Sequence, residues 1–239
     1  MGGLRPVIPP LHHVETTGST NEDLHALAED GAPDGTAIVA DTMSRGRGSR
    51  GRAWHAPHGG LWLSLLRRPT AAGETGVLSL RVGLALAPIL DQLSGQRVML
   101  KWPNDLLLGD RKLGGILCEM RWQAERANWV VIGVGINVAN PLPVELRDRA
   151  TSLASHAPGI TVAEALEAVI PPLRSLDVDR SHLSPSDLRA FRDRDWLYGR
   201  DVAAPVEGRV QGIDARGALE VVTPEGVQRT LLDAELVLV

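Results

Sequence analysis

The densest positive charge in the sequence lies in a glycine-rich segment, RGRGSRGRAW, over residues 45–54. No acidic residue occurs between Asp41 and Glu74, whereas that span holds six arginines, at positions 45, 47, 50, 52, 67 and 68. Glycine lets a backbone approach an anion closely, and guanidinium groups bond carboxylates and phosphates in pairs of hydrogen bonds. The segment therefore predicts a loop that binds a phosphate or a carboxylate. A disordered Arg-Gly segment that binds nucleic acid is the weaker alternative because repeats are absent. A Walker loop is excluded because no Gly-Lys-Ser/Thr follows.

A second candidate site combines KWPND, over residues 101–105, with RKLGGIL, over residues 111–117. These segments contain the only two lysines among the 25 basic residues. A proline-asparagine turn ends one strand and exposes the acid that follows. Asp105 can hold a metal ion or a ribose hydroxyl, and Lys112 can reach an oxyanion. The glycine pair at 114–115 leaves room for a ligand. A plain hairpin with a solvent-exposed lysine stays open as the alternative.

A third segment, GVGIN over residues 133–137, places two glycines inside a strand. Such glycines mark a bulge or a close approach of another group. A dinucleotide-binding loop is rejected because the fingerprint is incomplete and prolines, not a helix, follow.

The elements that must position these segments form a mixed order of helices and strands, without the regular alternation of a doubly wound fold. Helices are predicted over 19–31 with Ser19 as cap, over 77–93 with a kink or shifted boundary at Pro88, over 161–176 with an interruption at prolines 171 and 172, and over 184–196. Strands are predicted over 36–40, 61–66, 98–102, 106–108, 113–120 and 129–138. Short strands with glycine turns over 199–239 predict a small appended β-barrel.

Composition restricts the remaining possibilities. The chain of 239 residues has a formal net charge of −4, which argues against a general nucleic-acid coat. Its single cysteine, Cys118, excludes an internal disulfide and favours the cytoplasm. The first residues lack the apolar run of a signal peptide, and no segment approaches the ~20 apolar residues of a membrane span.

Taken together, the three segments and the Ser19-Thr20-Asn21 triplet resemble biotin protein ligases in order and spacing. The resemblance covers residues 14–239 and implies an α/β (α+β) fold: a class II synthetase-like mixed sheet flanked by helices, with an SH3-like C-terminal barrel. It implies a catalytic domain over 1–196 and a barrel over 197–239. With about a dozen residues before Val14, the chain resembles the monofunctional class without a DNA-binding domain, so no DNA partner is expected.

The resemblance implies ATP-dependent biotinylation of a carrier lysine through biotinyl-5′-AMP, with pyrophosphate and AMP as products. Lys112, Arg47 and Asp105 are the implied catalytic residues, and Asp105 is also the implied Mg²⁺ ligand. The implied biotin-binding residues are Ser19, Thr20, Asn21, Arg47, Gly48, Lys112 and Gly115. The implied ATP-binding residues are Arg50, Arg52, Trp54, Asn104 and Asn137.

Two positions depart from the family pattern. Ser49 stands where an arginine is usual, and Met43 stands where a glutamine is usual. Losing one guanidinium predicts weaker retention of the adenylate, and Met43 bears on biotin affinity or substrate identity. A lipoyl or octanoyl transferase of the same fold and a catalytically impaired biotin-binding sensor remain as alternatives. The expected partners are biotin, ATP and the biotin carboxyl carrier protein or domain of a carboxylase, with a homodimer through a sheet edge possible and no membrane.

Overall fold

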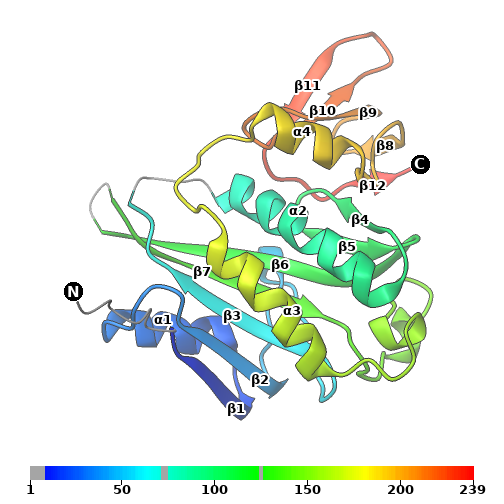
Figure 1. The fold of residues 1–239 in the computed structure, drawn as a ribbon. Helices are drawn as coiled ribbons and strands as arrows, with labels where there is room; N and C mark the ends of the chain where they lie inside the picture. The colour runs from blue at the N-terminus through cyan, green and yellow to red at the C-terminus, as the bar shows by residue number, and fades with distance from the viewer. Residues whose placement is uncertain (1–8, 71–74, 124–125) are drawn as a thin grey trace.

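The computed structural model describes residues 9–70, 75–123 and 126–239. The expectation that no signal peptide is present concerns the first residues, which lie largely outside this range. Two sheets organise the described chain, a larger one near its N-terminal end and a smaller one near its C-terminal end (Figure 1).

The larger sheet has seven strands in the order β1-β2-β3-β7-β6-β5-β4. Their bounds are β1 (Leu11–Thr17), β2 (Ala37–Met43), β3 (Leu61–Arg67), β4 (Val98–Lys101), β5 (Asp105–Leu108), β6 (Arg111–Gln123) and β7 (Arg126–Ile136). Among the strands of the described residues, only β1 and β2 pair in parallel, which confirms the predicted mixed sheet. β1 was not predicted, because this largely exposed edge strand, LHHVETT, carries no alternation of apolar and polar residues.

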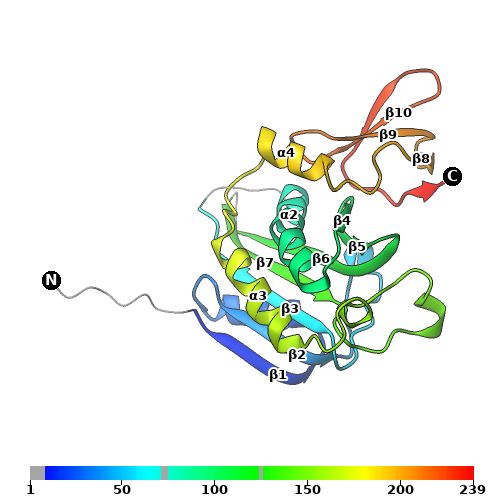
Figure 2. The same cartoon turned by 45° about the vertical axis from the view of Figure 1, so that its right-hand side comes forward.

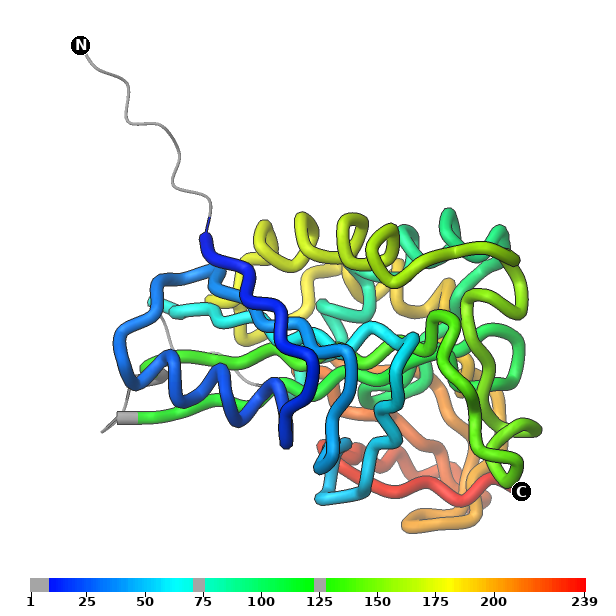
Figure 3. The backbone as a smooth tube through the Cα atoms, turned by 90° about the horizontal axis from the view of Figure 1, so that it is seen from below, coloured from blue at the N-terminus to red at the C-terminus, as the bar shows by residue number. Residues whose placement is uncertain are grey.

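The two faces of this sheet have different coverings. Alternate residues of β7, including Val130 and Ile132, pack with α2 (Thr75–Ser94) and α3 (Val162–Ser175) in the main core. Val131 faces the other way and packs with Leu24 of α1 (Thr20–Glu29). Figure 3 shows α1 and the α2–α3 layer on opposite sides of the strands. Because α1 covers only part of its face, the remainder is open to a ligand.

Helix capping follows the sequence in α3 and α4 (Pro185–Arg192), where Thr161 and Ser184 each form a capping box with an acid three residues later. Ser19 precedes α1 as expected, but its side chain makes no capping hydrogen bond. The predicted interruption at Pro171 and Pro172 is wrong, since α3 continues through both. Its buried apolar face compensates for the cost of proline inside a helix.

Two other helix expectations need correction. The boundary expected to shift at Pro88 does not, since α2 continues past it to Ser94, whereas a kink there stays a prediction; α4 stops at Arg192 rather than at residue 196. Residues after α4 instead pair with β4: the Leu100 amide donates to Arg194 and the Trp196 amide donates to Leu100. Sequence periodicity does not predict this pairing, because the pairing depends on a strand almost a hundred residues away.

The smaller sheet confirms the predicted C-terminal β unit, with five antiparallel strands in the order β11-β10-β9-β8-β12. They are β8 (Asp201–Ala204), β9 (Gly208–Ile213), β10 (Leu219–Val222), β11 (Gln228–Leu231) and β12 (Val237–Leu238). Figure 2 shows α4 between α2 and this sheet. Trp102 donates its indole N–H to the Gly217 carbonyl at 2.9 Å, joining the two units. The boundary between residues 196 and 197 stays a prediction.

By length and composition, the Gly76–Ser94 segment of α2 is apolar enough to cross a membrane, contrary to the expectation that no segment approaches such a span. Its side chains Val82, Leu86 and Leu90 are fully buried between the sheet and neighbouring helices. The apolar character of α2 is therefore that of a core helix.

Candidate active site

A cavity of about 470 Å³ lies on the same sheet face as α1, over the part that this helix leaves uncovered. Strand register explains its floor. Trp62 of β3, Gly135 of β7 and Gly115 of β6 form one row across the sheet, and Ser64, Gly133 and Leu117 form the next row. The central strand thus offers two positions without side chains, and groups from other segments fill this space.

Nearly all residues predicted for the site line this one cavity, although they come from segments more than a hundred residues apart. They are Ser19, Thr20, Asn21, Arg47, Gly48, Arg52, Trp54, Asn104, Asp105, Lys112, Gly115 and Asn137. Met43 and Ser49, which depart from the family pattern, line it too. Arg50 is absent from the lining residues, and its guanidinium pairs with Asp233 of the C-terminal unit.

One end of the floor is polar and held by a network around Asn21. The side-chain amide of Asn21 donates to Glu119 Oε2 at 2.6 Å, and its carbonyl oxygen lies 2.5 Å from the Ser64 hydroxyl. A Cβ atom at Gly133 would lie 2.5 Å from Asn21 Oδ1, so only glycine accommodates this side chain. Thr20 Oγ1 lies 2.8 Å from Ser64 Oγ and 3.6 Å from the Met43 sulfur. The unusual Met43 is therefore in direct contact with the predicted biotin-binding triplet.

At the next row of the floor, the indole of Trp54 lies against Gly135 and Gly115. A Cβ at Gly135 would come within 2.9 Å of the indole, and one at Gly115 within 3.3 Å. Lys112 Nζ is 5.1 Å from the centre of a Trp54 ring and 2.6 Å from Asp105 Oδ1. The cation–π contact and the ion pair hold the lysine ammonium at the cavity surface. The Lys112 ammonium group could therefore bind an oxyanion, either in place of the Asp105 carboxylate or together with it.

The arginines of the 45–54 loop are paired with carboxylates from two distant segments. Arg47 lies 2.8 Å from Glu22 of α1, and Arg52 lies 3.6 Å from Glu235 of the C-terminal unit. In Figure 3 the tip of this loop lies beside the C-terminal strands. These ion pairs are exposed, so each contributes little to stability and can be exchanged for an anionic ligand at small cost.

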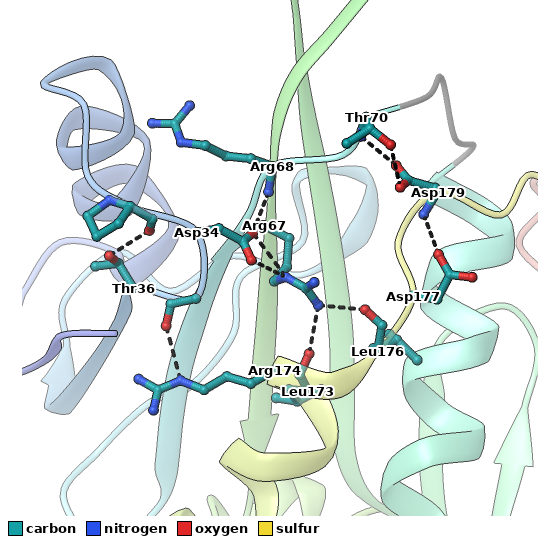
Figure 4. A network of polar contacts seen from close by, with 12 residues as sticks. Asp34, Thr36, Arg67, Arg68, Thr70, Leu173, Arg174, Leu176, Asp177 and Asp179 are labelled. Atoms are coloured by element: carbon teal, nitrogen blue, oxygen red, sulfur yellow. Dashed lines mark hydrogen bonds and ion pairs between the residues drawn. The ribbon is translucent and has the colours of Figure 1, made fainter. Parts of the chain in front are cut away.

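The other two arginines of the acid-free span have structural contacts (Figure 4). Arg67 bonds Asp34 and donates to the carbonyl oxygens of Leu173 and Leu176 at the end of α3. Arg68 donates to carbonyl oxygens at the end of α1. The six arginines that cluster in the sequence are therefore separated in the fold: Arg47 and Arg52 line the cavity, whereas Arg67 and Arg68 do not.

Two residues predicted to bind ATP form hydrogen bonds to backbone carbonyl groups through their side chains. Asn104 donates its amide to the Ile116 carbonyl at 2.7 Å. Asn137 donates to the Thr151 carbonyl at 3.1 Å and accepts from Asn140 at 3.1 Å. Both residues also line the cavity.

Sequence reasoning missed several lining residues, including Trp62, Arg149 and Trp196. It noted Lys101 within its motif but assigned it no role. Lys101 Nζ lies 4.9 Å from the centre of a Trp196 ring, and burial lowers the pKa of this lysine while Asp105 opposes the shift. The scarcity of lysine was a usable signal for Lys101, whereas nothing local distinguishes Arg149 from the other arginines.

Comparison with known proteins identifies this arrangement. Residues 14–137 match the model of the biotin/lipoate A/B protein ligase family, and residues 201–238 match the biotin protein ligase C-terminal domain. The chain is 34% identical to the bifunctional ligase/repressor BirA of Bacillus subtilis, over 95% of this chain and 74% of that protein. It is also 34% identical to the biotin–[acetyl-CoA-carboxylase] ligase of Mycobacterium tuberculosis, over 90% of this chain and 81% of that one.

Among solved structures, the biotin protein ligase of Aquifex aeolicus in complex with biotin and ATP superposes with a TM-score of 0.81 at 28% identity, covering 96% of this chain and 98% of that one. The chain belongs to the biotin protein ligase family. The predicted fold and ligase activity are thereby confirmed. The roles of individual residues rest on the geometry above.

Proposed function

We propose that the protein activates biotin with ATP on the cavity floor and transfers the biotinyl group to a lysine of a carboxylase carrier protein or domain. The observation that carries this proposal is the convergence of Lys112, the Ser19-Thr20-Asn21 triplet and the 45–54 loop on one cavity. In the first step a biotin carboxylate oxygen attacks the α-phosphorus, and the bond to the pyrophosphate oxygen breaks. In the second, the carrier amine attacks the acyl carbon, AMP leaves and the amine loses a proton.

Lys112 has the geometry for the first step. Two anions must approach each other, so a preplaced cation lowers the barrier most where charge accumulates. Its ammonium group lies over a Trp54 ring and next to Gly115, at the surface of the cavity. We assign Lys112 to the biotin carboxylate and the α-phosphate, with Arg47 at the same end.

The ring of biotin is assigned to Ser19, Thr20 and Asn21, beside Gly115 and Gly48. These side chains are buried and polar, and the Ser19 hydroxyl is not used to cap α1. A buried polar surface of this kind suits a ligand with its own hydrogen-bonding groups, because unpaired buried polar atoms are costly. The remaining contacts, from Met43 and Leu117, are apolar and suit the hydrocarbon part of the ligand.

ATP is assigned to Arg52, Trp54, Asn104 and Asn137, with Arg50 joining only after its contact with Asp233 is released. Closure of the 45–54 loop over the adenylate would exclude water from a hydrolysable intermediate.

The residues present fit Mg²⁺ held largely by nucleotide phosphates. Asp105 supplies one cavity-lining carboxylate, and no cluster of three or more acidic, histidine or cysteine ligands exists among the described residues. Mg²⁺ commonly binds through one or two carboxylates together with phosphates and water. Asp105 would hold the ion, which supplies charge neutralisation at the phosphates, and Lys112 would then separate from Asp105.

The decisive experiment is ATP–pyrophosphate exchange with candidate acids, followed by mass spectrometry of a carrier domain. Exchange that depends on biotin and a single biotinyl addition to a carrier lysine are expected. Exchange with lipoate instead would favour the lipoyl enzyme, and biotin binding without exchange would favour the sensor.

We place this activity in the cytoplasm because the chain has a single cysteine, and we assign no role to DNA or a membrane. A homodimer would be built on the exposed edge strand β1 of the larger sheet.

A further inference from the structure

Glu119 does not line the cavity itself, but it is hydrogen-bonded to a residue that does. It lies on β6, on the same face as Gly115 and Leu117, but it is not among the lining residues. Its Oε2 atom accepts a hydrogen bond of 2.6 Å from the side-chain amide of Asn21, which does line the cavity. A charge-assisted bond of this length is among the stronger polar contacts in proteins.

This contact, together with a longer one of 3.5 Å from the same NH₂ group to the Leu117 carbonyl, determines which way the Asn21 amide points. A carboxylate accepts hydrogen bonds and cannot donate them, so the NH₂ group of Asn21 must face Glu119. The carbonyl oxygen then faces the Ser64 hydroxyl on β3, at 2.5 Å. Ser64 alone would not impose this orientation, because a hydroxyl can either donate to the oxygen or accept from the NH₂ group.

The other neighbour of Glu119 does not compete for it. His25, one turn after Asn21 on α1, accepts a 2.9 Å hydrogen bond at Nδ1 from the indole of Trp129, and its Nε2 lies 3.9 Å from Glu119. Burial lowers the pKa of His25, which favours the neutral ring. Asn21 therefore provides the short contact to Glu119.

We propose that Glu119 is a positioning residue for biotin: it fixes the Asn21 amide so that the cavity presents a carbonyl acceptor, and not an NH₂ donor, to the N–H groups of the ureido ring. This inference rests on the proposed function, since it concerns the cavity end assigned to biotin. Without Glu119, only the 3.5 Å contact with the Leu117 carbonyl would oppose a half-turn of the amide, which would reverse the pattern that it offers to the ligand.

The test is a double-mutant cycle on biotin binding, measured by titration calorimetry on the full chain. Glu119→Ala should raise the Kd for biotin about 10- to 100-fold, since a hydrogen bond to a charged group contributes about 1.5–3 kcal/mol. The KM for ATP should stay within about 2-fold. Glu119→Gln should restore binding to within about 3-fold, because its carbonyl oxygen can accept from Asn21. In an Asn21→Ala background, Glu119→Ala should add no more than about 2-fold.

The matched control is Trp129→Phe, which removes a different tie between α1 and the sheet while leaving Asn21 untouched. It should lower the Tm and leave the Kd for biotin unchanged. Should Glu119→Ala fail to fold, the cycle is run with Glu119→Gln and Glu119→Met, where only Met should weaken binding.

An unchanged Kd in Glu119→Ala or Glu119→Met, or a full additional loss in the Asn21→Ala background, would overturn this inference while the proposed function stands. An equal loss of biotin affinity in Trp129→Phe would show that Glu119 acts only by stabilising the fold, and would also overturn the inference. Failure of the unaltered protein to bind biotin would overturn the proposed function, and this inference with it.

Discussion

Replacing Gly133 by alanine tests the packing on which the polar end of the cavity depends. The added Cβ would lie 2.5 Å from Asn21 Oδ1 and 3.0 Å from Nδ2, well inside van der Waals contact. Asn21 cannot simply move away, because Ser64 and Glu119 hold it from two other strands. The substitution should therefore displace the amide and break or lengthen both hydrogen bonds.

The expected size of the effect follows from those bonds. A neutral hydrogen bond contributes about 0.5–1.5 kcal/mol and one to a charged group about 1.5–3 kcal/mol. Alanine in a strand recovers about 0.5–1 kcal/mol relative to glycine. Gly133→Ala should then lower the free energy of unfolding by about 1–4 kcal/mol, and weaken biotin binding by at least about 10-fold.

Urea unfolding and biotin titration measure the two effects. Gly76→Ala is the matched control, since no atom lies within 4 Å of the added Cβ and alanine favours the α2 helix that contains it. It should be neutral or slightly stabilising. If Gly133→Ala instead unfolds at the same urea concentration as the unaltered protein and binds biotin equally well, the proposed packing of Asn21 on the strand is incorrect.

Three further predictions concern the cation, the loop and the junction between the sheets. Lys112→Ala should reduce biotin-dependent pyrophosphate exchange at least about 100-fold with the Tm within a few degrees; retained exchange would remove Lys112 from the reaction. Ser49→Arg restores a guanidinium to the cavity lining and should slow release of labelled biotinyl-adenylate about 10- to 100-fold; equal release rates would refute the weaker-retention hypothesis. Burial raises the pKa of Asp195 to about 6 from 3.8, so the folded state binds the proton more tightly and the free energy of unfolding should fall as the pH rises from about 4 to 6. Asp195→Asn should remove this decline and stabilise the protein at pH 7 by up to about 3 kcal/mol, and urea unfolding at pH 5 and pH 7 in both proteins measures it.

The sequence predicted the residues of the candidate site better than it predicted their polar contacts. Lys112 and Asp105 were identified from the motifs that contain the only two lysines, and the Ser19-Thr20-Asn21 triplet was identified from the resemblance to biotin protein ligases. Arg50 was assigned to ATP from the loop sequence, yet its contact in the fold is Asp233, a residue 183 positions away. No local pattern reports such a contact, since the loop and the C-terminal unit meet only after both sheets have formed.

Helix boundaries show the same limit. The capping boxes at Thr161 and Ser184 were readable because the interacting atoms are three residues apart. The prolines of α3 were misread, because the energy that keeps the helix continuous comes from packing against a distant core. The edge strand β1 was missed because its pairing with β2, and not its side-chain pattern, makes it a strand.

By itself, the sequence indicated the class of fold, the family and about a third of the residues that line the cavity, because residue type, short-range spacing and the resemblance to a known family carry that information. Tertiary structure decided how those side chains are oriented. Only strand register brings Gly133 beneath Asn21 and Gly135 beneath Trp54, and only the packing of α1 on the sheet brings Glu119 to the Asn21 amide. Hydrogen-bond direction depends on atoms within about 3 Å of each other, and Asn21 and Glu119 lie 98 residues apart in this chain.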